Sequence, residues 1–361
     1  MMAVLSDMIE YSALSAKLRA LSARLLTEDD YRGLAAAKSV RDFAERLFDG
    51  NRFDDYTPEL REAAAGGRVT LEKGLLQSLY PSLPGIFMFL RDENARKYLD
   101  AVILRYRADI IKGMIRAVFD RRPISDLTPR YSRFLRRRMG VDLDQLAAAQ
   151  NIPEFLRRLG ASEFADAVKN INAENPTLFD FETQIDFFCY RTKWDETRRR
   201  LSGANLASAR RVNGEEIDMI NISHIYRLKN HYELGESIIY SCIAPIQYKL
   251  KKSELNALVH AATDAEFADI LERSHYRDVF TGRPLAEIER SVTAGRLRAH
   301  LEEERRHPFS LAIVTSYLYK KRLEVRNLVT LTECVRYGIG SEPAMRKILV
   351  PNGKGSDLSS G

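Results

Sequence analysis

Apolar side chains recur every three or four positions along most of the chain, which is the spacing of one face of an α-helix. The clearest cases are the segments 94–120, 215–234 and 307–339, in which the pattern continues over the whole length. The last of these has Pro308 in its first turn, where proline is tolerated, and Gly338 near its end. The pattern predicts three long helices.

Patterns typical of β-strands are almost absent. An Asn-Gly pair within residues 211–217 resembles a hairpin turn, but helical residues follow it directly, so we expect a loop there. Proline and glycine mark further breaks near 121–128 and 235–252. The periodicity therefore predicts an all-α protein.

A short helix–turn–helix motif occurs three times. In each copy a residue that can cap a helix is followed three positions later by an acid, which is the pattern of a capping box. A Phe comes next, and a Leu four positions after the Phe restarts the apolar face, so we expect caps and core at these sites. The copies are Ser39, Asp42, Phe43 and Leu47; Asn151, Glu154, Phe155 and Leu159; and Thr263, Glu266, Phe267 and Leu271.

A short helix precedes each cap, with an acid, an apolar residue, Leu and Ala in fixed places. Its leucines, Leu34, Leu146 and Leu258, are spaced by 112 positions. Such spacing predicts an internal repeat of about 110 residues and hence three similar helical lobes. We place the lobes at 1–125, 126–240 and 241–350, followed by a tail, 351–361, that we expect to be disordered.

The long helices show a second, looser recurrence of an acid, an apolar neighbour and a polar residue at the third position. Its spacing from the first motif drifts, as variation in loop length would produce. We expect one long helix in each repeat. The three sets are Asp109, Ile110 and Lys112; Asp218, Met219 and Asn221; and Glu324, Val325 and Asn327.

Composition and charge change this picture little. The chain has 361 residues, a net charge of +6 and both signs of charge interspersed, which is ordinary for a soluble surface. Its three cysteines show no CxxC spacing, so we expect no disulfide framework and a reducing compartment. The best apolar run is interrupted by Pro245 and is far shorter than a membrane span, and the first residues lack the core of a signal peptide.

Sequence motifs that carry catalysis are missing, among them the phosphate-binding glycine loops. His224 and His231 are seven residues apart on one predicted helix, but no carboxylate is placed to complete a metal site with them. We therefore predict no catalytic residue, cofactor or metal. An all-α enzyme with a metal held by His224 or His231 is an alternative.

Two basic clusters, at 130–138 and 190–200, have aromatic residues between the charges, including the only tryptophan, Trp194. A helical-repeat RNA-binding protein would need such a pattern and is a second alternative. However, acidic residues interrupt the second cluster, and charge runs on helices are mostly solvated faces. We expect no nucleic acid to bind.

Two stretches, 216–232 and 307–339, resemble the C subunit of the V/A-type rotary ATPases, which is homologous to subunit d of the eukaryotic vacuolar ATPase. The chain departs from the family pattern at Arg322, where a second acid is expected, and it is somewhat longer. The matching positions are Asp218, Asn221, Arg227 and Lys229 in the first stretch, and Pro308, Tyr317, Lys320, Glu324 and Asn327 in the second.

The resemblance implies a funnel of three helical lobes around a pseudo-threefold axis, with a central cavity. It implies a non-catalytic connector that seats the central-shaft subunits, of the D and F types, on the membrane proteolipid ring. Such a connector transmits torque between ATP hydrolysis or synthesis and ion translocation. It would be peripheral on the cytoplasmic face of the membrane, and no homo-oligomer is expected.

A seat for the shaft should be wet and charged, so charged and aromatic residues of the long helices are the candidates. Each could instead be an ordinary exposed helix residue. The apolar segment 79–90 is a candidate for contact with the ring, although a buried loop has the same composition. The candidate shaft contacts are Arg105, Tyr106, Arg107, Arg227, Lys229, Lys320 and Lys321.

Overall fold

The structure is a computed structural model in which every element of the described residues is helical, so the all-α prediction is confirmed. None of these helices is both long and apolar enough to cross a lipid bilayer. The described residues are 2–49, 68–122, 133–160, 162–169, 171 and 177–351.

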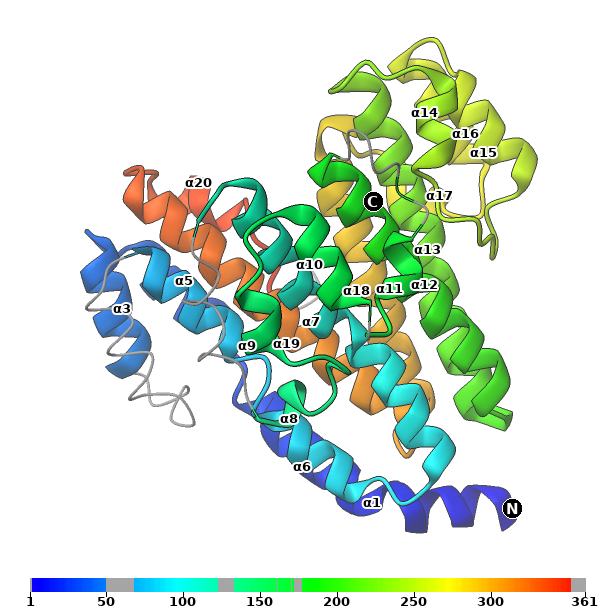
Figure 1. Cartoon of the computed structure of the whole chain (residues 1–361). Helices are drawn as coiled ribbons and strands as arrows, with labels where there is room; N and C mark the ends of the chain where they lie inside the picture. Colours follow the sequence, from blue (N-terminus) through cyan, green and yellow to red (C-terminus); the bar gives the residue numbers. More distant parts are fainter. Residues whose placement is uncertain are drawn as a thin grey trace.

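Six long helices form the body of the molecule (Figure 1). α12 packs along α7, α18 packs along α13, and α19 packs against α18 and α1. Short linkers join α12 to α13 and α18 to α19, so the chain turns back directly from one long helix to the next. The long helices are α1 (Met2–Ala23), α7 (Glu93–Phe119), α12 (Leu178–Arg200), α13 (Gly203–Asn230), α18 (Ile288–Arg306) and α19 (Leu311–Arg336).

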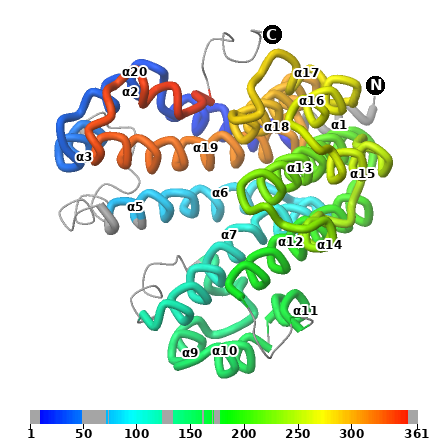
Figure 2. Tube along the Cα trace, turned by 90° about the horizontal axis from the view of Figure 1, so that it is seen from above, coloured from blue at the N-terminus to red at the C-terminus, as the bar shows by residue number. Residues whose placement is uncertain are grey.

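The three copies of the short motif form three corners of the molecule, which lie at separate edges in Figure 2. Corner 1 consists of α2 (Glu28–Ala35) and α3 (Val40–Asp49), corner 2 of α9 (Leu143–Ala147) and α10 (Ile152–Leu159), and corner 3 of α15 (Lys252–His260) and α16 (Asp264–Arg273). The other short helices are α5 (Arg68–Gln77), α6 (Ser82–Phe89), α8 (Arg133–Arg136), α11 (Ala165–Val168), α14 (Glu236–Ser241), α17 (Arg277–Phe280), η3 (Leu285–Glu287) and α20 (Ser341–Met345).

All three corners share one cap geometry. The side chains of Ser39, Asn151 and Thr263 accept a hydrogen bond from the backbone N–H three residues later, at 3.1, 2.9 and 3.2 Å. The acid at that position accepts from the N–H of the residue before the cap, at 2.8, 2.9 and 2.7 Å. A capping box would place this second bond on the cap residue itself. Here the acid reaches one residue further back and ties the incoming turn to the helix.

The apolar positions of the motif are buried in every corner. Phe43, Phe155 and Phe267 expose at most 1% of their surface. The leucines that follow them, Leu47, Leu159 and Leu271, are buried as well. Each corner thus buries the same two apolar positions of the motif.

The corners differ in which helix they pack on. Corner 2 packs on α7 and corner 3 on α13, each a helix that precedes the corner in the chain. Corner 1 packs on α19, from the opposite end of the chain. The two ends are joined by hydrogen bonds from the Leu26 N–H to Glu324 at 2.7 Å and from the Ser15 hydroxyl to the carbonyl of Pro308 at 2.8 Å. Packing thus groups 311–351 with the N-terminal elements, while the three predicted domain ranges remain a prediction.

In two of the three sets of the looser recurrence, the acid and the polar residue are buried and bind the backbone of another segment. We call such a pair of residues a clamp, and its acid the clamp acid. Asp218 accepts from the backbone N–H groups of residues 248–250, and Glu324 accepts from that of Leu26. Asn221 and Asn327 each pair with both backbone groups of one residue, Ala244 and Leu349.

The third set behaves differently. Asp109 contacts Arg322 and Lys112, whereas the contact with the chain before corner 2 comes from Arg107, which donates to the carbonyl of Arg138 at 2.6 Å. The match of Asp109 to the two clamp acids is therefore wrong in structural terms. Spacing alone could not distinguish two polar residues that are neighbours on one helix.

Two local predictions are also wrong. Residues 211–217 are helical, inside α13, and the side chain of Tyr248 occupies the place where a side chain of Gly214 would be. The glycine of the Asn-Gly pair thus allows Tyr248 to pack closely on α13 and does not form a turn. The last long helix begins at Leu311, capped by Ser310, and not at Pro308. Of the predicted tail, residues 352–361 lie outside the described part of the chain.

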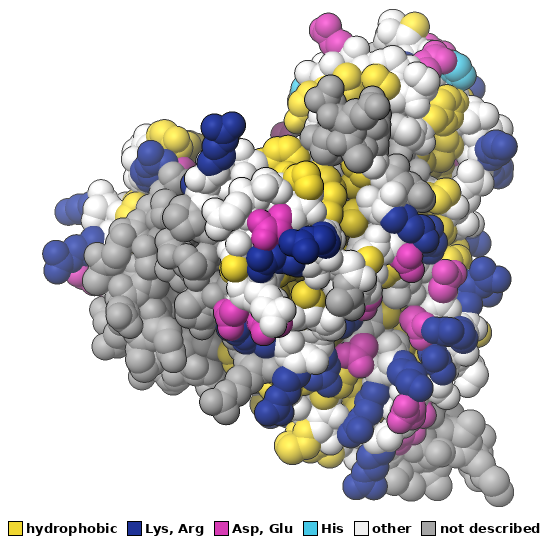
Figure 3. All heavy atoms as spheres, viewed as in Figure 1, with side chains coloured by type: hydrophobic (Ala, Val, Ile, Leu, Met, Phe, Trp, Pro, Cys, Tyr) yellow, Lys and Arg dark blue, Asp and Glu magenta, His cyan; other side chains and the backbone are white. Residues whose placement is uncertain are grey.

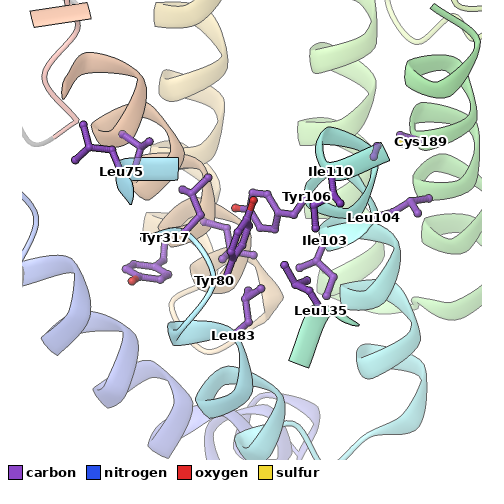
Figure 4. Close-up of a cluster of buried hydrophobic side chains, with 14 of the residues drawn as sticks. Leu75, Tyr80, Leu83, Ile103, Leu104, Tyr106, Ile110, Leu135, Cys189 and Tyr317 are labelled. Carbon is purple, nitrogen blue, oxygen red and sulfur yellow. The ribbon is translucent and has the colours of Figure 1, made fainter. Parts of the chain in front are cut away.

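The apolar segment 79–90 packs largely inward. Figure 4 shows Tyr80 and Leu83 among buried side chains of α7 and α19. The ring of Tyr80 meets that of Tyr106 edge-on, with centroids 5.9 Å apart. Met88 is 70% exposed and is the large apolar residue of the segment that remains open to solvent. The segment is therefore mainly part of the core.

Candidate functional site

A charged cleft lies where α7, α12, α13, α18 and α19 meet. It consists of an inner cavity of ≈ 70 Å³ and an adjoining outer cavity of ≈ 350 Å³. Arg105, Arg296, Tyr319 and Arg322 line both cavities, which joins them into one site that we call the arginine cleft. The other charged residues in its described walls are Lys193, Glu216, Asp109 and Arg326.

Four helices supply the cations of the arginine cleft. Arg322 and Arg326 stand one turn apart on α19, so their side chains share a face. Arg105 comes from α7, Arg296 from α18 and Lys193 from α12. The site thus depends on the packing of helices that are distant in sequence.

Glu216 holds the inner end of the cleft together. Its buried carboxylate accepts hydrogen bonds from Lys193 and from Arg296, so it links α12, α13 and α18. Burial by itself would raise the pKa of Glu216, but the charges of Arg296 and Lys193 outweigh it and lower the pKa. This carboxylate is therefore ionised and fully engaged by its two cations.

The outer end has a second ion network. Arg322 donates to Asp109 at 3.3 Å, and Lys112 binds Asp186 at 2.7 Å. Arg105 is 3.9 Å from Asp186 and donates to the hydroxyl of Tyr190 at 2.6 Å. Burial raises the pKa of Asp186, yet Arg105 and Lys112 lower it overall, so this carboxylate is also ionised.

His300 lines the inner cavity as an uncharged ring. It stacks on Tyr319, with ring centroids 4.5 Å apart, and is 7% exposed. Desolvation by burial lowers the pKa of His300 to about 3, and although Glu216 opposes this shift, Arg296 adds to it. At neutral pH the ring therefore contributes no charge to the cleft.

The predicted shaft contacts are scattered in the structure. Arg105 and Tyr106 line the arginine cleft, and burial raises the pKa of Tyr106 to about 12. Arg107 faces corner 2, where it also binds Glu163 at 2.9 Å. Lys229 donates to the carbonyl of Val259, in α15 of corner 3.

The remaining candidates are engaged elsewhere. Lys320 is buried and binds Glu304 of α18 at 3.0 Å. Lys321 binds the clamp acid Glu324 at 2.6 Å, and Arg227 is 3.8 Å from Glu289. The structure therefore brings two of the seven candidates together.

Sequence reasoning missed Arg296, Arg322 and Arg326, which supply most of the positive charge of the cleft. One signal was present, because Arg322 was the position at which the chain departs from the family pattern and Arg326 follows it by one turn. Nothing in the sequence pattern indicated that α18 would place Arg296 beside them.

The alternative functions gain no support. Within the described residues, no group of three His, Cys, Asp or Glu side chains is placed to hold a metal, and His231 is exposed beyond the end of α13. In the two basic clusters Arg138 binds Asp100 and Arg200 binds Glu196, each at 3.0 Å. The face in Figure 3 likewise shows basic side chains interspersed with acidic ones.

The described residues form an all-helical body with a charged cleft built from five helices. Comparison with known sequences specifies the class: residues 14–346 match the sequence model of the ATP synthase (C/AC39) subunit family, so the chain belongs to that family. The family is a structural component of the ATP synthase and is not catalytic. The resemblance seen in the sequence is confirmed.

Several archaeal relatives, each the C subunit of an A-type ATP synthase, cover nearly the whole chain. The relative from Pyrococcus abyssi is 23% identical over 344 residues, covering 92% of this chain and 88% of its own length. The relative from Thermococcus kodakarensis is 22% identical, covering 94% and 90%. That from Methanosphaera stadtmanae is 21% identical, covering 92% and 86%.

Proposed function

We propose that this chain is the central-stalk connector of an A/V-type rotary ATPase. It seats the end of the central shaft in the arginine cleft and rests on the membrane proteolipid ring, at the cytoplasmic face. It passes torque between ATP hydrolysis or synthesis and ion translocation. Family membership supports a place in the ATPase complex, and the arginine cleft is the observation that carries the connector role.

The charge of the cleft favours an acidic partner. Its described walls carry five cationic side chains and two carboxylates, and Asp109 and Glu216 each already bind cations. A partner surface rich in Asp and Glu would be attracted before contact and oriented on arrival. We therefore expect the end of the shaft to present carboxylates to Arg322 and Arg326.

A connector that carries torque must resist shear between its helices, and the walls of the cleft supply cross-links for this. Glu216 links three helices at the inner end of the cleft. Arg211 of α13 binds Glu303 of α18 at 2.9 Å further along the same pair. Packed helices with ionic links between them transmit strain rather than absorb it.

The ring contact requires apolar surface on this chain. Because segment 79–90 packs inward, we place the contact at exposed apolar side chains instead. Phe179 at the start of α12 is 43% exposed, and Ile238 and Tyr240 of α14 are 46% and 39% exposed. These three residues are the candidates for the surface that meets the ring.

Co-purification tests the proposal. The tagged full chain should retain a coiled-coil shaft subunit and a proteolipid ring from its native membranes. The double change Arg322→Glu and Arg326→Glu should remove the shaft, whereas Arg336→Glu, further along α19 and outside the cleft, should not. Shaft retention should also fall between about 0.05 and 0.5 M salt, because screening weakens a charged seat. If neither salt nor the charge reversal changed the amount of shaft retained, the proposal that the shaft binds in the arginine cleft would be wrong.

A further inference from the structure

The arginine cleft contains more positive charge than its own carboxylates balance. Glu216 is saturated by Lys193 and Arg296. The carboxylate nearest to Arg105, Asp186, is 3.9 Å away and is already held by Lys112 at 2.7 Å. The cleft is therefore cationic after every ion pair in its described walls is counted.

Three guanidinium groups gather around Tyr319. Arg296 also binds Glu216 and Arg322 also donates to Asp109 at 3.3 Å, so three cations share two carboxylates there. Arg296 lies over the ring of Tyr319, 5.1 Å from its centroid. Arg322 and Arg326 line the outer cavity beside it, and Arg326 donates to the hydroxyl of Thr293 at 3.2 Å. Arg326 itself is exposed at the outer cavity. Desolvation lowers its pKa, Tyr319 opposes the shift, and the like charges of Arg296 and Arg322 add to it.

An anion would relieve this repulsion, and the kind of anion follows from the donors. A guanidinium group presents a planar fork of N–H donors that matches the oxygens of a phosphate or carboxylate. Three such forks from two helices suit a compact group with several oxygens rather than a single flat carboxylate. The outer cavity, of ≈ 350 Å³, is also lined by Leu76 and Val329, and Leu76 is 50% exposed, so the cavity is open to solvent on that side.

We propose that the arginine cleft binds a phosphate group through Arg296, Arg322 and Arg326. Inorganic phosphate and the phosphates of a nucleotide carry this same chemistry, and both fit the donors. The site does not depend on the shaft, because every donor belongs to this chain. The proposal therefore goes beyond the connector role, and each can fail without the other.

Titration calorimetry on the isolated full chain tests the site, at constant ionic strength set with chloride. The two probes are inorganic phosphate and ATP without Mg²⁺, which separate a free phosphate from a nucleotide. We expect one site per chain for at least one probe. Arg322→Gln and Arg326→Gln should each weaken binding at least tenfold, since each removes a charged donor. Arg322→Lys, which keeps the charge but loses the fork, should weaken it less than Arg322→Gln.

Arg336→Gln is the matched control, because it removes one charge from the same helix outside the cleft and should leave the affinity unchanged. NMR of the histidine side chains gives a second readout. The signal of His300 should shift on adding the probe in the wild-type chain and should remain fixed in Arg322→Gln.

Several results would overturn the site: no binding of either probe, equal binding by Arg322→Gln, or equal competition by chloride at the same ionic strength. Shaft retention in phosphate-free buffer is measured separately. If the shaft is retained and no phosphate binds, only the anion site is lost. If phosphate binds and the shaft is not retained, only the connector role is lost.

Discussion

Two parts of the molecule solve the same packing problem with different chain connections. The continuous unit, 203–306, builds α13, corner 3 and α18 from one stretch of chain. The split unit combines 311–351 with 2–49 and 68–77, so α19 meets corner 1 across the two ends of the sequence. In both, a buried acid of a long helix binds the backbone just before the corner, and an Asn three residues later binds a second segment, at Ala244 or Leu349.

The clamps correspond closely. Leu250 and Leu26, whose N–H groups bind Asp218 and Glu324 at 2.8 and 2.7 Å, each lie eight residues before the matching leucine of their corner. The difference lies in what the clamp joins. The bond to Asp218 closes a loop of about 30 residues, whereas Glu324 reaches a residue 298 positions away. Corner 1 is therefore held on α19 by packing and hydrogen bonds alone.

Removing the clamp acids is the largest expected perturbation. Asp218 accepts from three backbone N–H groups and from the hydroxyl of Tyr276 at 2.7 Å, so Asp218→Ala leaves four donors unpaired. We expect a loss of at least about 3 kcal/mol in the free energy of unfolding, because each buried donor left without an acceptor costs about 1–3 kcal/mol. Glu324→Ala, which removes the acceptor of the Leu26 N–H and the ion pair with Lys321, should lose about 1–3 kcal/mol.

Urea unfolding of both variants measures these values. Asp218→Asn serves as the control, because it keeps one acceptor oxygen and should lose less than Asp218→Ala. If Glu324→Ala proved the more damaging change, the ranking of the two clamps by their number of hydrogen bonds would be wrong.

The next largest expected difference between the two units is in the local opening of their corners. Corner 1 has no direct chain connection to α19, whereas corner 3 follows α13 and precedes α18 in one stretch of chain. We expect amide hydrogens of α2 and α3 to exchange about 10–100 times faster than those of α15 and α16. Glu324→Ala should accelerate exchange in corner 1 alone. Equal protection of the two corners would show that the missing chain connection has no energetic effect.

How much of this comparison the sequence predicts can be seen in the corners. Their caps and buried phenylalanines follow from local spacing, because a cap and an apolar face are properties of neighbouring residues. The helix on which corner 1 packs does not follow from local spacing. A repeat is recognised by positions along the chain, whereas packing brings together surfaces that can be distant in sequence. Gly214 shows the same limit: the Asn-Gly pair lies inside a helix, and only the fold reveals that Tyr248 packs where a side chain of Gly214 would be.

The arginine cleft shows where prediction of the site stops. Arg105 and Tyr106 are found because charges and aromatics on a long helix are natural candidates. Lys320 has the same sequence character but faces Glu304 and is buried. Which side of α19 meets α7 and α18 is decided by the whole fold, so Arg322 and Arg326 are identified only when those helices are placed together.

Protonation of His300 should weaken the contact between α18 and α19, which lie in different units. His300 of α18 stacks on Tyr319 of α19, and Glu216, Arg296, Lys193 and Lys320 supply the charges around it. Its pKa of about 3 lies below the ordinary 6.5, so the unfolded chain binds the proton first as the pH falls. Stability from this group is full above pH 6.5 and is lost between pH 6.5 and 3.

The expected loss is about 1.4 kcal/mol per pH unit, or about 2 kcal/mol from pH 6.5 to 5. His300→Phe keeps a ring on Tyr319 and removes the titration, so its unfolding free energy should fall less over the same range. Denaturant unfolding at both pH values measures the difference. Identical slopes for the two proteins would place the acid sensitivity at other groups.

The smallest effect tests whether the three corners are equivalent at their caps. Ser39→Ala, Asn151→Ala and Thr263→Ala each remove the acceptor for one backbone N–H, and each should lower the free energy of global unfolding by about 1 kcal/mol. Ser39→Asp, which keeps an acceptor, is the control for corner 1. In hydrogen exchange, however, Ser39→Ala should also accelerate the local opening of α2 and α3. Thr263→Ala should leave local exchange in corner 3 nearly unchanged, because the tethered corner opens mainly with its whole unit. If the three substitutions lowered the free energy of global unfolding by different amounts, the caps would contribute unequally to stability despite their shared geometry. The two units would then differ in their corners as well as in their chain connections.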